Sequence, residues 1–181
     1  MFTISDNVIN EIEIKKSKFI CFLYKVNDVS LVNQYLDDVK KIYKGATHYC
    51  YAYNINGHMK ASDDNEPSGT AGAPMLDIIK LKDLTDILVI VVRYFGGIKL
   101  GSGGLIRAYR SSLTEALSKT NIISYKKYII KNIVLPLDKS NKLSILEKKY
   151  KLLNKEYSDK IIASFEIDED DISNFDSLLN N

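Results

Sequence analysis

The sequence predicts an α+β protein, in which strand and helix patterns follow one another without a regular alternation. Three observations carry this prediction. Residues 8–26 alternate between polar and apolar and then become continuously apolar, which is typical of a hairpin or two strands. Residues 48–54 alternate strictly, as a half-buried strand does. From residue 128 onward the patterns run strand, helix, strand, strand, helix.

A helix and then a further strand follow residues 8–26. Asp28 or Ser30 can cap the helix, and Gly45 suits its end. Its apolar residues recur with a period near 3.6, namely Leu31, Val32, Tyr35, Leu36, Val39, Ile42 and Tyr43. The next strand places its tyrosines on one face and His48, Cys50 and Ala52 on the other. The tyrosine face could stack nucleic-acid bases, but we expect that a helix covers it.

Turn and loop signals organise the middle of the chain. Asn56-Gly57 predicts a tight turn, and residues 62–72 form a polar loop. Pro74 fits the first turn of a short helix that runs through Ile79. After it, the sequence predicts a strand over 87–95, a glycine-rich loop over 96–104 and a helix over 105–119.

The pattern restarts near residues 121–125, so we expect domains at 1–123 and 124–181. In the second domain, Asp138 or Ser140 caps a helix that reaches Tyr150. Strands are expected at 128–135, 152–157 and 161–167, with a last helix at 170–179. This order is that of a ferredoxin-like unit without its last strand, which would leave strand 128–135 at the edge of the sheet.

The glycine-rich loop is the strongest functional signal. It holds five of the nine glycines, and all three arginines, Arg93, Arg107 and Arg110, flank it. A glycine loop between a strand and a helix start points N–H groups at an anion or lets another backbone approach closely. A Walker A loop would need a lysine before Ser102, and a dinucleotide fingerprint would need glycine or alanine at Ile106. We therefore expect no nucleotide cofactor. A structural turn and a site for another anion both stay open.

The acidic loop carries Asp63, Asp64 and Glu66 within four residues. Such carboxylates bind hard cations, perform acid–base chemistry, or lie in a solvated turn. The spacing lacks the ligand pattern of an EF-hand. We expect these acids to face Arg93 or Arg107 across a cleft, so that the two loops converge on one surface.

Composition limits the class of protein. The net charge of +2 is too small by itself to indicate a nucleic-acid or membrane surface, although lysines gather over 126–160 and acids over 161–181. Cys21 and Cys50 have no paired spacing, so neither zinc nor a disulfide framework is expected. The start of the chain lacks a signal-peptide pattern, and no apolar run is long enough to span a bilayer. We expect a cytoplasmic monomer without metal, cofactor or membrane contact.

Four stretches of the chain resemble the YigZ/IMPACT family, whose first domain is called the Impact N-terminal domain. They cover most of residues 15–117 and are 15–20, 46–53, 62–72 and 91–109. Asn65 stands where the family usually has glycine, and asparagine tolerates the left-handed turn expected there. The resemblance implies a first domain similar to domain 2 of ribosomal protein S5, with four strands backed by helices. It implies a second domain similar to domain V of elongation factor G.

The resemblance also implies a function. Eukaryotic relatives regulate translation by competing for the activator of an initiation-factor kinase, and RNA or ribosome binding has been inferred for bacterial ones. We therefore expect a non-enzymatic binding protein acting near translation, with RNA, the ribosome or a translation-regulatory protein as partner. The alternative is a small hydrolase that uses the acidic loop with His48. The expected ligand-binding residues are His48, Asp63, Asp64, Glu66, Ser68, Thr70, Arg93, Tyr94, Gly96, Gly97, Gly101, Ser102, Gly103, Gly104, Arg107 and Tyr109.

Overall fold

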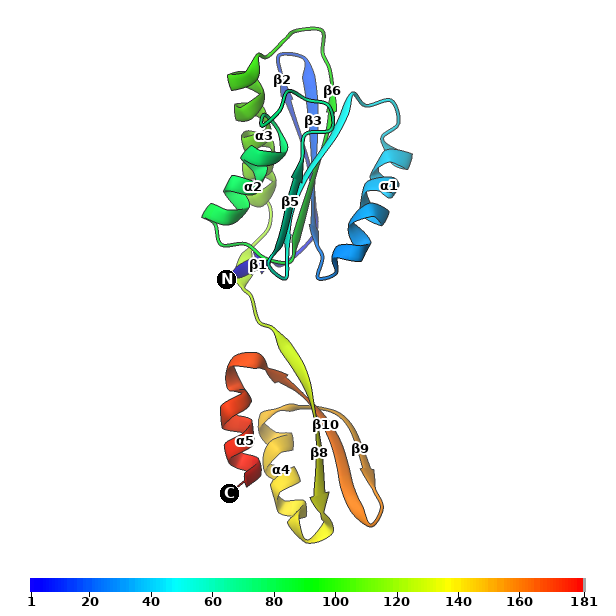
Figure 1. Ribbon diagram of the computed structural model, residues 1–181, viewed down its shortest axis with the longest axis vertical. Helices are drawn as coiled ribbons and strands as arrows, with labels where there is room; N and C mark the ends of the chain where they lie inside the picture. The colour runs from blue at the N-terminus through cyan, green and yellow to red at the C-terminus, as the bar shows by residue number, and fades with distance from the viewer. Residues whose placement is uncertain (181) are drawn as a thin grey trace. The chain divides into compact units, whose positions relative to one another are not determined.

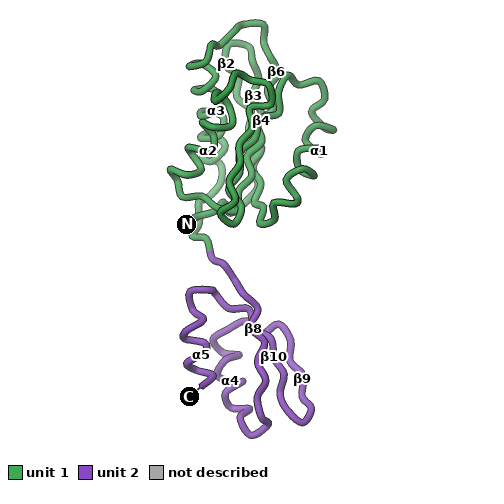
Figure 2. Tube along the Cα trace, in the orientation of Figure 1, with its two compact units in different colours: residues 1–125 green, residues 126–181 purple. Residues whose placement is uncertain are grey.

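The computed structural model describes residues 1–180 as a mixed α/β chain with two compact units. Residues 1–125 form the first unit, and the second begins at Lys126 (Figure 2). No helix within residues 1–180 is long and apolar enough to cross a membrane. The first unit has two apolar clusters, and the second unit has its own.

The first unit is built on a five-stranded antiparallel sheet of order β2-β3-β6-β4-β5. Its strands are β2 (Val8–Ile14), β3 (Ser17–Lys25), β4 (His48–Ile55), β5 (His58–Ser62) and β6 (Ile87–Tyr94). The sheet has one strand more than the four expected. The additional strand is β5, which pairs with β4 after a tight turn at Asn56 and Gly57. Both turn residues have positive φ, 50° and 81°, as the tightest hairpin turns require.

Helices cover both faces of this sheet (Figure 1). On one face lie α2 (Gly72–Leu81) and α3 (Ser102–Leu117), and on the other lies α1 (Val32–Ile42). The central strand β6 is therefore apolar on both sides: Val89 and Val91 join the core under α2 and α3, whereas Ile90 and Val92 join the core under α1. This explains its continuous apolar run.

The two faces of β4 separate as its alternation predicts. Tyr49, Tyr51 and Tyr53 pack in the core under α1, and Cys50 and Ala52 pack in the opposite core. The expectation that a helix covers the tyrosine face is confirmed. His48, at the start of this strand, is partly exposed at the rim of the second face.

Three features differ from the expectation, two of them in the first unit and the third in both units. Short strands β1 (Phe2–Ile4) and β7 (Ile122–Ser124) pair with each other, so the first unit includes residues that the sequence assigned to the junction. Helix α3 begins at Ser102 rather than at 105, which puts Gly103 and Gly104 inside the helix instead of the loop. One-turn 3₁₀ segments precede three of the helices, at Val29–Leu31, Leu137–Lys139 and Glu169–Asp171.

A hairpin turn of two lysines joins β2 to β3. Lys15 and Lys16 both take positive φ, 47° and 63°, a conformation that glycine or asparagine normally supplies. The backbone of Lys16 is approached closely by Gly96, where an added Cβ would lie 2.0 Å from its carbonyl carbon. Only glycine fits at position 96, and the end of β6 is thereby held against this turn.

The second unit has the predicted order of elements, β8 (Tyr128–Pro136), α4 (Ser140–Lys149), β9 (Lys151–Tyr157), β10 (Lys160–Asp168) and α5 (Ile172–Asn180). Its sheet order is β8-β10-β9, and α4 and α5 pack on the sheet face that carries Ile133 and Phe165, with Phe175 of α5 in the same core. Among the described residues β8 pairs with β10 alone, so its predicted position at the edge of the sheet is confirmed.

Candidate functional site

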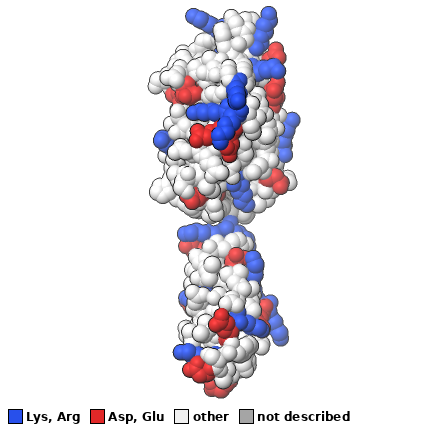
Figure 3. Space-filling model, turned by 90° about the vertical axis from the view of Figure 1, so that its right-hand side faces the viewer, with Lys and Arg blue, Asp and Glu red and all other residues white. Residues whose placement is uncertain are grey.

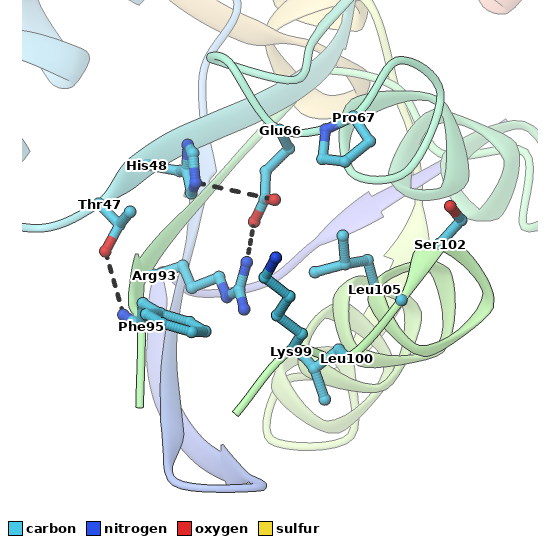
Figure 4. Close-up of a pocket in the computed structure, with 11 residues that line it drawn as sticks. Thr47, His48, Glu66, Pro67, Arg93, Phe95, Lys99, Leu100, Ser102 and Leu105 are labelled. Atoms are coloured by element: carbon cyan, nitrogen blue, oxygen red, sulfur yellow. Dashed lines mark hydrogen bonds and ion pairs between the residues drawn. The ribbon is translucent and has the colours of Figure 1, made fainter. Parts of the chain in front are cut away.

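A cavity of about 400 Å³ opens at the end of the first unit where the acidic and glycine-rich loops meet (Figure 4). We call it the polar pocket. It combines charged, hydroxyl and apolar side chains from β4, β6, α3 and the two loops. Its lining residues are Thr47, His48, Glu66, Pro67, Arg93, Phe95, Lys99, Leu100, Gly101, Ser102 and Leu105.

Arg93 forms the floor of the polar pocket. It is the one charged residue of β6, and only 6% of its side chain is exposed. Its guanidinium lies between the rings of Phe19 and Phe95, with its carbon 5.4 and 5.6 Å from their centroids. Such stacking suits the flat, weakly hydrated guanidinium better than a lysine ammonium.

Glu66 supplies the counter-charge. Arg93 Nη1 donates to Glu66 Oε1 over 2.6 Å, and the glutamate side chain is only 2% exposed. The hydroxyl of Tyr109 donates to the same oxygen over 2.9 Å, and His48 Nε2 lies 3.7 Å from Oε2 (Figure 4). A buried ion pair of this kind is tolerated because each partner also has further hydrogen bonds or ring contacts.

Tyr109 stays a hydrogen-bond donor in this setting. Burial, together with the neighbouring Cys50 thiol and Glu66 carboxylate, raises the pKa of Tyr109 far above its ordinary value. Its ring packs edge-on against Phe19, with the centroids 5.3 Å apart. The neutral phenol therefore fixes helix α3 to the acidic loop.

The other two acids of the loop face the backbone rather than the polar pocket. Asp63 accepts N–H bonds from Gly69, Ala71 and Gly72, each between 2.8 and 2.9 Å. Burial of Asp63 alone would raise its pKa, but these three hydrogen bonds outweigh it and hold the pKa of this carboxyl below its usual value. Asp63 thus shapes the loop that leads into α2.

Asp64 positions the histidine. Its carboxylate accepts the backbone N–H of Tyr49 over 2.6 Å, and its carbonyl accepts Nδ1–H of His48 over 2.8 Å. Asp64 and Asn65 both have positive φ, 42° and 67°. The left-handed turn expected at Asn65 is therefore present, and it turns Glu66 inward.

The predicted convergence of the two loops is present, but not every predicted residue reaches the polar pocket. His48, Glu66, Arg93, Gly101 and Ser102 line it. Tyr109 contacts the ion pair from behind. The remaining predicted residues, none of which is among the lining residues, are Asp63, Asp64, Ser68, Thr70, Tyr94, Gly96, Gly97, Gly103, Gly104 and Arg107.

Several of these residues have structural contacts instead. The Thr70 hydroxyl donates to the carbonyl of Pro67, and Ser68 is exposed. The Tyr94 hydroxyl donates to the carbonyl of Lys44, because Tyr94 points to the α1 face. Arg107 is exposed on the first turns of α3.

Sequence reasoning missed the uncharged wall of the polar pocket. The missed residues are Thr47, Pro67, Phe95, Leu100 and Leu105, together with Lys99. The hydroxyl of Thr47 accepts the N–H of Phe95 over 3.0 Å and holds the start of the glycine loop. Phe95 directly precedes the glycine loop and Lys99 lies within it. An aromatic and a cationic residue at these positions were the sequence features that could have indicated the pocket lining.

The fold and the site define a class: an α+β protein whose sheet, sandwiched between helices, ends in a polar pocket above a buried arginine–glutamate pair. Residues 15–117 match the family model described as the Impact N-terminal domain. The chain therefore belongs to the Impact N-terminal domain family, and the resemblance stated from its motifs is confirmed.

Bacterial relatives support this assignment. The IMPACT family member YvyE of Bacillus subtilis (strain 168) is 48% identical over 128 residues, which cover 69% of this chain and 59% of that protein. The IMPACT family member YigZ of Escherichia coli (strain K12) is 39% identical over 110 residues, covering 58% of this chain and 54% of that protein. The chain thus spans less than two thirds of the length of these curated relatives.

A solved structure shares the fold. It is described as a crystal structure of a hypothetical protein, and it superposes with a TM-score of 0.73 at 27% sequence identity. The alignment covers 98% of this chain and 90% of that one. The similarity extends across both units, whereas the family model covers only the first.

Proposed function

We propose that the protein is a cytoplasmic, non-enzymatic binding protein that regulates translation, and that it holds its partner at the polar pocket. The partner is RNA, the ribosome or a translation-regulatory protein, as the family resemblance implies. The first unit would act as the Impact N-terminal domain (1–123), similar to domain 2 of ribosomal protein S5. The second (124–181) would be a ferredoxin-like domain without its last strand, similar to domain V of elongation factor G.

The observation that carries the binding role is the state of the acidic groups. Glu66 is bound by Arg93 and Tyr109, Asp63 by three backbone N–H groups, and Asp64 by the N–H of Tyr49. A general base must present a free acceptor to its substrate within hydrogen-bond reach. In each of these carboxylates at least one oxygen accepts a hydrogen bond within the protein, which favours a recognition role over the alternative hydrolase role.

On the one face that Figure 3 shows, the charge distribution favours a confined site over a broad surface. On the face shown in Figure 3, basic and acidic side chains are interspersed on both units. Non-specific binding to nucleic acid depends on many phosphate contacts from clustered lysine and arginine. The polar pocket, which is about the size of a small-molecule site, is therefore the better candidate for specific contact.

Affinity capture from cell lysate, with and without RNase, tests this proposal. The bait proteins are the wild type, Lys99→Glu at the polar pocket, and Lys119→Glu as a matched control beyond the far end of α3. We expect ribosomal subunits or translation factors to be enriched by the wild type and the control, and to be lost with Lys99→Glu. Loss on RNase treatment would assign the contact to RNA.

Two results would contradict the proposal. Translation components recovered equally by the wild type and by Lys99→Glu would remove the polar pocket from binding. A wild-type bait that recovers no translation component above an empty-resin control would remove translation from the function.

A further inference from the structure

We propose that the N-terminus of helix α3, together with Lys99 and Arg107, binds the phosphate group of a small phosphate monoester. This deepens the proposed function, because the site lies at the wall of the same polar pocket. The ligand that the polar pocket accepts would thus carry a phosphate group. Its support comes from backbone geometry, an unpartnered buried donor, charge and the shape of the lining.

The start of α3 presents unused backbone donors. The first bond at this end of the helix runs from Leu105 N–H to the carbonyl of Gly101 over 2.9 Å. Within residues 1–180, the N–H groups of Ser102, Gly103 and Gly104 have no acceptor, and the cap residue Gly101 has no side chain to supply one. Three free N–H groups at the positive end of a 16-residue helix form a ready anion site.

Arg93 gives a second, independent observation. Its Nε is buried and has no hydrogen-bond partner in the described part of the chain, although its Nη1 and Nη2 are bonded. A buried donor without an acceptor is unfavourable. Arg93 itself lines the polar pocket, so an oxyanion that enters there meets a buried guanidinium whose donors are not all satisfied.

Two further cations lie near the helix start without an ion-pair partner among the described residues. The Lys99 side chain lines the polar pocket (Figure 4). Arg107 reaches back along the helix, and its Nη1 lies 3.6 Å from the position that a Cβ on Gly103 would take. Because Glu66 is already neutralised by Arg93, Lys99 and Arg107 leave this corner with an excess of positive charge.

The remaining lining specifies the rest of the ligand. Phe95, Leu100, Leu105 and Pro67 give the polar pocket an apolar side, and Phe95 is 47% exposed while it stacks on Arg93. A cavity of about 400 Å³ admits one phosphate with a small aromatic or apolar group. Both a free phosphorylated metabolite and the phosphorylated end of an RNA strand carry this chemistry.

The test is a titration of ¹⁵N-labelled full-length protein with inorganic phosphate and with phenyl phosphate. We expect saturable shifts of the Ser102, Gly103 and Gly104 amide signals with both, and tighter binding of phenyl phosphate because its ring contacts Phe95. Absence of saturable shifts at these amides up to tens of millimolar would overturn the inference.

Proline at position 102 isolates the backbone contribution. Ser102 is the first residue of α3, where proline is well tolerated but removes the N–H group. Ser102→Pro, which removes the N–H, should bind phenyl phosphate about tenfold more weakly than Ser102→Ala, which removes the hydroxyl but keeps the N–H. Equal affinity of the two variants would contradict a backbone site.

Charge variants keep the inference testable if Ser102→Pro fails to fold. Lys99→Gln and Arg107→Gln should each weaken binding several-fold, and more at low salt than at high salt. Lys119→Gln, beyond the other end of α3, should have no effect. Weakening by Lys119→Gln equal to that by Lys99→Gln would show general charge attraction and overturn the site.

Two trinucleotides distinguish the sources of the phosphate. A 5′-phosphorylated oligouridylate should compete with phenyl phosphate, and the same oligonucleotide without the phosphate should not. Equal competition by both would overturn a phosphate-directed site. The titration uses purified protein alone, so its outcome is independent of the capture from lysate. If no phosphate binds but capture still depends on Lys99, only the phosphate site is refuted. Phosphate binding without capture of translation components would remove only the translational role.

Discussion

Tyr109 donates a hydrogen bond of 2.9 Å to Glu66, and this bond joins the middle of helix α3 to the acidic loop in the protein interior. The same carboxylate oxygen accepts Nη1 of Arg93 from strand β6. Three segments that are distant in the sequence therefore meet at one atom. The wall of the polar pocket is held by this junction, and its separate bonds can be tested by substitution.

Removing the phenolic donor should destabilise the first unit. Tyr109→Phe keeps the ring against Phe19 but leaves Glu66 with one fewer hydrogen bond, so we expect a loss of about 1.5–3 kcal/mol in urea unfolding. Tyr94→Phe is the matched control, because its hydroxyl bonds the Lys44 carbonyl at a solvent-accessible position over 3.2 Å. Its cost should stay below about 1 kcal/mol. Equal costs for the two variants would contradict the special role of Tyr109.

The buried ion pair should show strong coupling. Arg93→Met leaves the Glu66 carboxylate buried without its cation, and we expect the free energy of unfolding to fall by about 3–5 kcal/mol. Adding Glu66→Gln removes the unpaired charge and should recover a large part of this loss. Denaturant unfolding of the two single variants and the double variant measures the coupling energy. Strictly additive losses would mean that the two charges do not depend on each other.

Asp63 should contribute stability that depends on pH. Its folded pKa is held below the usual value by three backbone hydrogen bonds, in spite of its burial. Its contribution is therefore complete above the unfolded pKa of about 4 and disappears as pH falls through the folded value. Asp63→Asn should cost roughly 2 kcal/mol at pH 7, and the difference from wild type should shrink below about pH 4. A difference that stays constant from pH 7 to pH 2 would refute this assignment.

Both cysteines should be unreactive in the folded protein. Cys21 and Cys50 are fully buried, and burial raises the pKa of each thiol far above its ordinary value. Because the thiolate is the reactive form, a disulfide reagent at pH 8 should label neither residue on the time scale of minutes. Two thiols should react once the protein is unfolded in urea. Rapid labelling of one thiol under native conditions would reveal local opening around it.

The order of elements was predictable because the apolar periods of the longer segments are strong. The alternation of β4 identified which face carries the tyrosines, and the strand-helix-strand-strand-helix order placed β8 at an edge. Strand β5 was missed because the alternation over His58–Ser62 is short and rests on two apolar residues, Met59 and Ala61; the strand pairs with β4 at the edge of the sheet. Strands β1 and β7 were missed because three residues are too few to show a period.

The site was predictable only in outline. Residue types indicated that the acidic loop would meet an arginine, and Glu66 meets Arg93. The sequence could not show that Asp63 and Asp64 would turn to backbone N–H groups, because this depends on the left-handed turn at 64–65. Glycines at 103 and 104 disfavour helix, yet α3 begins before them. Its packing against the sheet outweighs their low propensity.

The lysine turn between β2 and β3 leaves room for engineering. Each non-glycine residue in a left-handed conformation costs on the order of 1 kcal/mol, and Asn-Gly is the pair that suits such a turn. Exchanging Lys15-Lys16 for Asn-Gly should therefore raise the melting temperature without touching either core. A variant stabilised in this way would tolerate the high ligand concentrations and long soaks that crystallography of weak complexes demands.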